Sequence, residues 1–182
     1  MRTTFLFLAL CCATLLTAQT DPRKPAETRA EYEKRYERRI QQEQLYGVYI
    51  PRDIGDAFNE LNKKIDAPSK AKFKALSEAD AVRKLYFSFG RWLSHNWSFY
   101  EGSRFSHYLR GLGLTHPDDM IEFVIITYHR SLHKKPLDVK PLLERILAAR
   151  KAEFDARRRG GEVLDAGKRQ RERPEDNDSS GQ

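Results

Sequence analysis

Residues 115–133, THPDDMIEFVIITYHRSLH, decide the fold that we predict for this chain. Pro117, Asp118 and Asp119 indicate a helix start, because proline suits the first helical turn and carboxylates there interact favourably with the helix dipole. Residues 120–128 then contain a single charge, a glutamate, so the segment is apolar on nearly every side. A helix of this kind is buried. We therefore predict that it is the central helix of the protein and that it runs to the end of the quoted segment.

Further helical patterns lie on both sides of this segment. Each begins at a residue that suits a helix start and then places apolar residues three and four positions apart. The predicted helix starts are Asp53, Pro68 or Ser69, Ser77, Ser103 and Asp138. No segment shows the sustained alternation of apolar and polar residues that is typical of a strand. The sequence therefore predicts an all-α fold with a single small, compact helical domain of about five helices.

We place this helical domain at residues 47–155, between two charged flanks. Residues 19–46 are rich in helix formers but have only a narrow apolar stripe, which predicts a charged, mostly exposed N-terminal helix or linker. A helix that binds a partner is the alternative for this flank. Residues 156–182 have almost no large apolar side chains, so they cannot offset the entropy of ordering. We predict that they form a disordered, charged C-terminal tail.

Residues 1–18 are typical of a secretory signal peptide. Arg2 precedes an apolar run of about a dozen residues, and the small residue Ala18 stands before Gln19 at the expected cleavage point. The run is shorter than the roughly 20 apolar residues of a transmembrane helix. We therefore predict an exported protein, periplasmic or secreted, whose mature chain begins at Gln19 and has no transmembrane segment.

Composition excludes several kinds of site. Both cysteines, Cys11 and Cys12, lie in the predicted signal peptide, so the mature chain can form no disulfide and offers no thiol for catalysis or metal binding. The net charge is +7 at pH 7, but basic and acidic residues are mixed along the chain, which is typical of a solvated surface. Together with export, this argues against a nucleic-acid partner. We expect no cofactor, and the sequence does not indicate an oligomeric state.

Asp118 and Asp119 are the sharpest candidates for catalytic residues. Paired carboxylates can hold a metal, share a proton or act as general acid and base. The other explanation is that they cap the helix and interact with its dipole, which stabilises the helix by roughly 0.3 to 1 kcal/mol for each carboxylate. That explanation also favours an arginine partner, and Arg104 and Arg130 are the obvious choices.

His129 and His133 lie one helical turn apart and could bind a metal from one face of the helix. Arg130 occupies the position at which the zinc-protease motif has its catalytic glutamate, so that motif is absent. A two-histidine site would therefore need an acidic ligand from elsewhere in the fold. The alternative is that His133 simply lies near the helix C-terminus, where a partial positive charge is favourable.

The segment 97–104 contains further candidates for binding residues. Trp97 and Tyr100 follow a predicted helix and precede a glycine, and aromatic residues beside polar groups on a loop are typical of recognition surfaces. A packed hinge is the alternative for Trp97. We predict that the binding residues are Trp97, Tyr100, Arg104 and Arg130.

The runs GRWLSHNW, GSRFSHYL, HPDDM and TYHR resemble the helical core of bacterial domain-of-unknown-function family 6794, over residues 48–132. HPDDM followed by YHR at this spacing is fairly specific. The resemblance implies a compact helical domain, often found in exported bacterial proteins, and it brings no established activity to these residues. Relatives tend to have another tryptophan near Tyr100 and fewer histidines around His95. Both charged flanks lie outside the resemblance.

These observations favour a non-catalytic module of the cell envelope that binds a protein or peptide through the 97–104 turn, with Arg130 and His129 beside it. A different class is the alternative, a small metal-dependent or acid–base hydrolase. Its residues would be Asp118, Asp119, His116 and His129. A third hypothesis is that residues 157–159, three arginines, bind anionic polymers or lipid headgroups.

Overall fold

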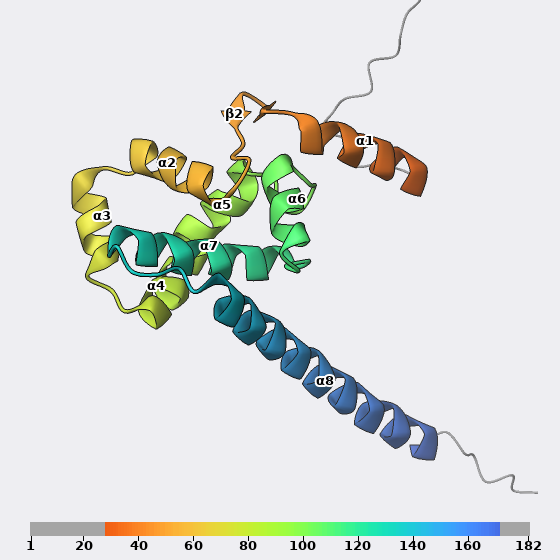
Figure 1. Ribbon diagram of the computed structural model, residues 1–182. Helices are drawn as coiled ribbons and strands as arrows, with labels where there is room; N and C mark the ends of the chain where they lie inside the picture. The colour runs from red at the N-terminus through yellow and green to blue at the C-terminus, as the bar shows by residue number, and fades with distance from the viewer. Residues whose placement is uncertain (1–27, 172–182) are drawn as a thin grey trace, which may run out of the picture.

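The computed structural model describes the backbone of residues 28–171 and the side chains of residues 28–160. This part of the chain is mostly helical, and its strands form a single short hairpin (Figure 1). In chain order the elements are α1 (Arg29–Gln41), β1 (Gln44–Leu45), β2 (Val48–Tyr49), α2 (Ile54–Lys64), α3 (Ala67–Lys74), α4 (Glu78–Leu85), the π-helical segment η1 (Tyr86–Gly90), α5 (Arg91–Asn96), α6 (Arg104–Gly111), α7 (Pro117–Leu132) and α8 (Val139–Arg171). The predicted all-α fold is confirmed.

Helix α7 is the central helix, as the sequence predicts. From Asp119 to His129 every side chain except that of Glu122 is buried. Helices α2 to α6, the segment η1 and helix α8 all contact it. Burying a large aliphatic or aromatic side chain stabilises a fold by about 1.5–3 kcal/mol, so the burial of α7 contributes strongly to the stability of the domain.

Capping residues fix where the surrounding helices begin. Asp53, Ser77 and Ser103 each accept a hydrogen bond from the backbone N–H three residues further on, at 2.8, 3.1 and 3.2 Å. All three were expected from the sequence. Helix α3 differs slightly, because Asp66 caps it and places its start before the predicted Pro68.

The single long helix predicted from Ser77 is interrupted by a π turn. The segment η1 separates α4 from α5, and it packs directly against α7. A π turn contains an extra residue, so it changes the direction of the side chains that follow it. Gly90 ends the π turn and packs closely against α7, since a Cβ atom there would lie 2.6 Å from Cγ2 of Ile121.

The hairpin of β1 and β2 was not predicted. Gln44 pairs with Tyr49 and Leu45 pairs with Val48. The two turn residues both have positive φ, 53° for Tyr46 and 78° for Gly47, which suits the twist of a two-residue hairpin turn. Strands of two residues are too short to show an alternating pattern, so periodicity gave no sign of them.

Helix α8 leaves the domain as a long arm (Figure 1). Residues 156–171, which we predicted to be part of a disordered tail, belong to this helix. Strong helix formers, mainly arginine and alanine, outnumber the glycines in this stretch and favour the helix. The predicted signal peptide, residues 1–18, and the last residues, 172–182, lie outside the described part of the chain.

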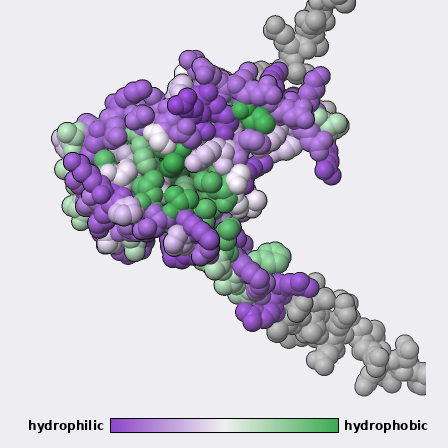
Figure 2. All heavy atoms as spheres, viewed as in Figure 1, coloured by the Kyte–Doolittle hydropathy of each residue, from purple (hydrophilic) through white to green (hydrophobic). Residues whose placement is uncertain are grey.

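Figure 2 shows apolar side chains gathered over α7 and the first turns of α8, within a rim of hydrophilic side chains. Leu142 and Ile146 of α8 are almost fully buried there. Farther along α8, Phe154 is exposed. Among the described residues, no helix is both long enough and apolar enough to cross a membrane.

The close approach at Gly90 predicts the effect of adding a methyl group. Gly90→Ala should lower the free energy of unfolding by about 1–3 kcal/mol, as overpacking does. Gly111→Ala is the matched control, because nothing lies within 4 Å of its Cβ position and alanine favours a helix. It should leave stability unchanged or raise it. Urea unfolding followed by circular dichroism measures both, and equal stabilities would contradict the close approach.

Candidate functional site

Asp119 and Arg150 form an ion pair that joins α7 to α8. Arg150 donates from Nε to both carboxylate oxygens of Asp119, at 3.1 and 3.2 Å, and from Nη2 to Oδ1 at 2.7 Å. The Asp119 side chain is only 8% exposed. The predicted partners, Arg104 and Arg130, are wrong, because the arginine comes from a later helix. Asp119 is therefore neutralised within the fold.

Asp118 lies beside this pair, with Oδ2 4.0 Å from Nη2 of Arg150, and faces two tyrosines. His116, and not either aspartate, caps α7, since its Nδ1 accepts a hydrogen bond from the backbone N–H of Asp118 at 3.3 Å. The Tyr100 hydroxyl donates to Asp118 at 3.4 Å. Burial and a hydrogen bond to Asp118 raise the pKa of the Tyr86 hydroxyl above its usual value. Asp118 therefore holds the hydroxyl of Tyr100 and lies close to that of Tyr86.

His129 and His133 lie at the opposite end of α7 and bind backbone carbonyls. Nε2 of His129 donates to the carbonyl of Leu76 at 2.9 Å, and Nε2 of His133 donates to that of Lys74 at 3.0 Å. At about 1.5 Å per residue, His129 is about 15 Å from Asp119 along the helix. Within the described part of the chain, no group of three or more His, Cys, Asp or Glu residues could hold a metal. The four residues of the hydrolase hypothesis therefore do not share one site.

Trp97 lies in the core, not on a surface turn as predicted. Its side chain is 0% exposed, and its ring packs edge-to-face against Phe105 with the centroids 5.1 Å apart. Helix α5 ends at Asn96, and Ser98 has a φ of 50°, so the chain changes direction around Trp97 while the ring stays inside. The packed-hinge alternative describes this residue. The buried Trp97 ring therefore offers no exposed surface to a binding partner.

The two arginines predicted as binding residues are both engaged within the fold. Arg104 donates from Nε to a backbone carbonyl at 2.7 Å, and its guanidinium lies 5.0 Å from the ring centroid of Tyr49. Arg130 donates to both carboxylate oxygens of Glu78, at 2.9 and 3.0 Å. Of the predicted binding residues only Tyr100 is mostly exposed, at 62%.

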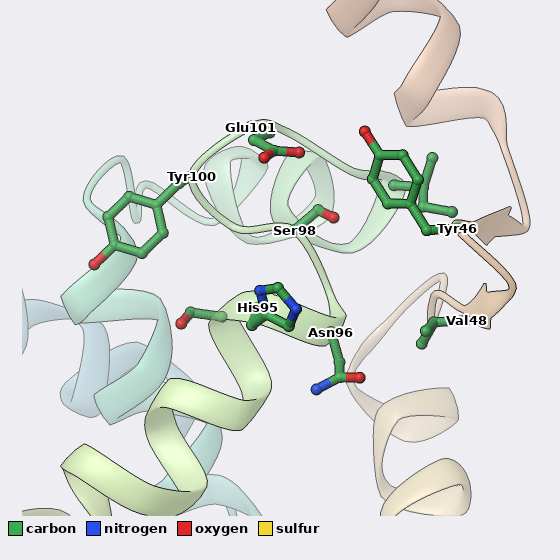
Figure 3. Close-up of a pocket in the computed structure, with 9 residues that line it drawn as sticks. Tyr46, Val48, His95, Asn96, Ser98, Tyr100 and Glu101 are labelled. Carbon is green, nitrogen blue, oxygen red and sulfur yellow. The ribbon is translucent and has the colours of Figure 1, made fainter. Parts of the chain in front are cut away.

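A cleft of about 230 Å³ lies between the β-hairpin and the end of α5. Figure 3 shows His95 in the middle of this cleft, with Tyr46 of the hairpin on one side and Tyr100 on the other. The His95 side chain makes no hydrogen bond or ion pair with any residue that the structure describes. Other lining residues are Val48, Asn96, Ser98 and Glu101.

A second hollow, of about 380 Å³, lies beside the first and reaches the π-helical segment. Its far side is lined by Phe87, which is 83% exposed. The two hollows share Ser94, His95 and Tyr100, so they adjoin each other along one grooved surface. We call it the aromatic groove, and its exposed rings are those of Tyr46, Phe87, His95 and Tyr100.

Sequence reasoning missed three of these residues. Phe87 does not lie on the apolar face of its predicted helix. A large aromatic residue outside that face could have been predicted to be exposed. Tyr46 precedes a glycine between short apolar segments, which is a weak hairpin signal. His95 gave no signal, because its place in a groove depends on where the hairpin packs.

Residues 50–132 match the model of a protein family described as a domain of unknown function, DUF6794. This part of the chain belongs to that family. No curated protein and no solved structure matches the chain. The DUF6794 domain therefore spans α2 to the end of α7 and contains Phe87, His95 and Tyr100. The hairpin with Tyr46 and the arm with Arg150 lie outside the matched residues.

The ion pair between Glu78 and Arg130 predicts how the DUF6794 domain responds to acid. Hydrogen bonds from Arg130 lower the pKa of Glu78. Its contribution to stability is therefore complete above the unfolded pKa, about 4.3, and is lost as the pH falls through the lower folded pKa. Glu78→Gln should destabilise the domain by about 1 kcal/mol at neutral pH and should flatten the loss of stability at lower pH.

Urea unfolding at about pH 7, 5 and 3 measures this difference. Asp155→Asn is the control, because Asp155 pairs with the exposed Lys151 on the α8 arm. It should change neither the stability nor its acid dependence by more than a few tenths of a kcal/mol. A Glu78→Gln variant with the acid dependence of the wild type would contradict the prediction.

Proposed function

We propose that this chain is exported and that its DUF6794 domain binds an extended peptide segment of another protein in the aromatic groove. One observation carries the proposal: three large aromatic rings remain exposed along a single groove, Phe87 at 83%, Tyr100 at 62% and Tyr46 at 47%. Burying such rings against a partner is favourable, and aromatic residues are enriched in the centres of binding sites. Exposed aromatic groups in a hollow are therefore the best-supported binding surface of this domain.

Two of these rings, those of Tyr100 and Tyr46, are also held in place before any partner arrives. The Tyr100 hydroxyl is bonded to Asp118 on α7. The Tyr46 hydroxyl accepts a hydrogen bond from Nη1 of Arg39 at 3.2 Å. A partner that binds here does not need to order these side chains, which lowers the entropic cost of binding.

The other hypotheses have less support. The hydrolase needs a free carboxylate near a free histidine, but Asp119 is paired with Arg150 and His129 is bonded to a carbonyl at the far end of α7. Binding of anionic polymers through residues 157–159 stays a prediction. Arg157 already pairs with Glu153 one turn earlier on α8.

Export predicts a defined N-terminus. Signal peptidase should cut between Ala18 and Gln19, because a small residue precedes the cleaved bond. Intact-mass spectrometry of the chain expressed in a bacterium should therefore find a product that begins at Gln19. Ala18→Arg should block this cut and leave the precursor. A wild-type product that retains residues 1–18 would contradict export by this route.

The groove is tested by selection from a random peptide library displayed on phage, with the full chain immobilised. The wild type should enrich a recurring peptide pattern. Tyr100→Ala should weaken the binding of the enriched peptides at least about tenfold, which is the size of effect expected for a central aromatic contact. Fluorescence anisotropy with the synthetic peptides measures the affinities.

Two variants serve as controls for this test. Tyr100→Phe keeps the ring and loses only the hydroxyl, so it should keep most of the affinity. Phe154→Ala removes an equally exposed ring on the distant α8 arm and should change nothing. The proposed function is wrong if the library gives no enrichment, or if Tyr100→Ala and Phe154→Ala bind equally well.

A further inference from the structure

The acidic side chains around the aromatic groove are already paired with arginines. Among the described residues that line its two hollows, Glu101 is the only acidic one, and its carboxylate accepts a hydrogen bond from Nη2 of Arg39 at 2.6 Å. Asp118, which binds the hydroxyl of Tyr100, has Oδ2 4.0 Å from Nη2 of Arg150. Neither carboxylate is therefore free to attract a cation in a ligand.

Two basic side chains of α5, in contrast, line the second hollow without a partner. Arg91 and His95 lie four residues apart, which places them on the same face of the helix. Neither side chain makes a hydrogen bond or an ion pair with any residue that the structure describes. The exposed ring of Phe87 and the side chain of Ile121 line the same hollow. Apolar walls lower the local dielectric, so they strengthen the attraction of these groups for an anion.

The opposite end of the grooved surface carries another unpaired arginine. A third hollow, of about 210 Å³, adjoins the first, because Leu45 and Tyr46 line both of them. Arg38 lines this third hollow, is exposed, and makes no hydrogen bond or ion pair with any described residue. The other two arginines that line it are each paired with a glutamate. Along the described walls of the three hollows, the charged groups without a partner are therefore all positive.

A carboxylate suits these groups. The guanidinium of Arg91 is planar and can donate two parallel hydrogen bonds to the two oxygens of one carboxylate. The imidazole of His95, one helical turn away, offers a ring N–H to the same anion. A peptide supplies such carboxylates from aspartate and glutamate, and its apolar side chains can cover the exposed rings of the groove.

We propose that the ligand of the aromatic groove is an acidic peptide segment. One aspartate or glutamate side chain of the peptide pairs with Arg91 and His95, and a second pairs with Arg38. Apolar side chains of the peptide lie against the rings of Tyr100 and Tyr46 in the hollow between them. This inference rests on the peptide-binding function proposed above, and it adds the charge and the chemical class of the peptide.

Fluorescence anisotropy with short labelled peptides, all amidated at the C-terminus, tests the charge of the ligand on the full chain. The first peptide alternates glutamate with leucine and tyrosine. The second has glutamine in place of each glutamate, and the third has lysine there. The first peptide should bind, and each of the others should bind at least about tenfold more weakly. A glutamine peptide with a free C-terminal carboxylate should bind no better than its amidated form.

Variants of the protein test where the carboxylate binds. Arg91→Gln should weaken the binding of the glutamate peptide at least about tenfold and should leave that of the glutamine peptide unchanged. Arg91→Lys keeps the charge without the planar fork, so its affinity should be intermediate. Arg38→Gln should weaken the glutamate peptide severalfold. Arg159→Gln is the matched control, because it removes the same charge from the exposed α8 arm, and it should change no affinity.

The outcomes separate this inference from the proposed function. Library selection that enriches neutral or basic peptides would overturn the acidic ligand and leave peptide binding intact. Equal losses of affinity in Arg91→Gln and Arg159→Gln would also overturn it, because the net charge of the protein would then explain the binding. So would a glutamine peptide that binds as tightly as the glutamate peptide once its C-terminal carboxylate is free.

Two further results would remove both proposals. One is library selection without any enrichment. The other is an alginate oligosaccharide, which also carries carboxylates, that binds more tightly than the glutamate peptide and loses its binding in Arg91→Gln. The groove would then recognise an acidic sugar. Urea unfolding of each variant ensures that a lost affinity does not reflect a lost fold.

Discussion

The burial of α7 is the constraint on which the rest of the structure depends. A helix of 16 residues that is apolar on nearly every side must be covered on every side, and the surrounding helices are arranged to do so. Covering its two ends also buries polar groups, which must be paired inside the protein. Arg150 pairs with Asp119 at one end, and a backbone carbonyl pairs with His129 at the other. The polar residues of α7 are thus largely explained by folding.

The burial of α7 helps to separate two kinds of residue: those whose side chains are already bonded within the fold, and those whose side chains are exposed and could contact a partner. Asp119, His129 and Arg130 concentrate the features of an active site in the sequence, yet each completes a bond that the buried helix requires. The side chains of Phe87 and Tyr100 are instead 83% and 62% exposed, so burial in the core does not explain their aromatic rings. An aromatic ring that is exposed without a structural reason indicates a binding surface. It does so more strongly than an ionisable side chain that the fold itself requires.

The same physics explains how far the sequence could predict the structure. The central helix and the caps at Asp53, Ser77 and Ser103 depend on local patterns, so they were predicted correctly. The Asp119–Arg150 pair joins residues 31 positions apart, and nothing in the spacing of charges distinguishes Arg150 from other arginines. The π turn depends on the close packing of Gly90 against α7. The spacing of apolar residues in the sequence therefore could not predict the π turn.

The aromatic groove shows why a site assembled from distant segments stays hidden in a sequence. One wall belongs to the DUF6794 domain, and the other is the hairpin that precedes it. Arg39 of α1 joins the two walls: it donates to the carbonyl of Gly102 at 3.0 Å, to Glu101 at 2.6 Å and to the hydroxyl of Tyr46. The turn that follows Tyr100 and the hairpin that carries Tyr46 are therefore held by one guanidinium. The width of the groove is set by a buried arginine outside the family domain, so neither the domain nor the flanking segment defines the site alone.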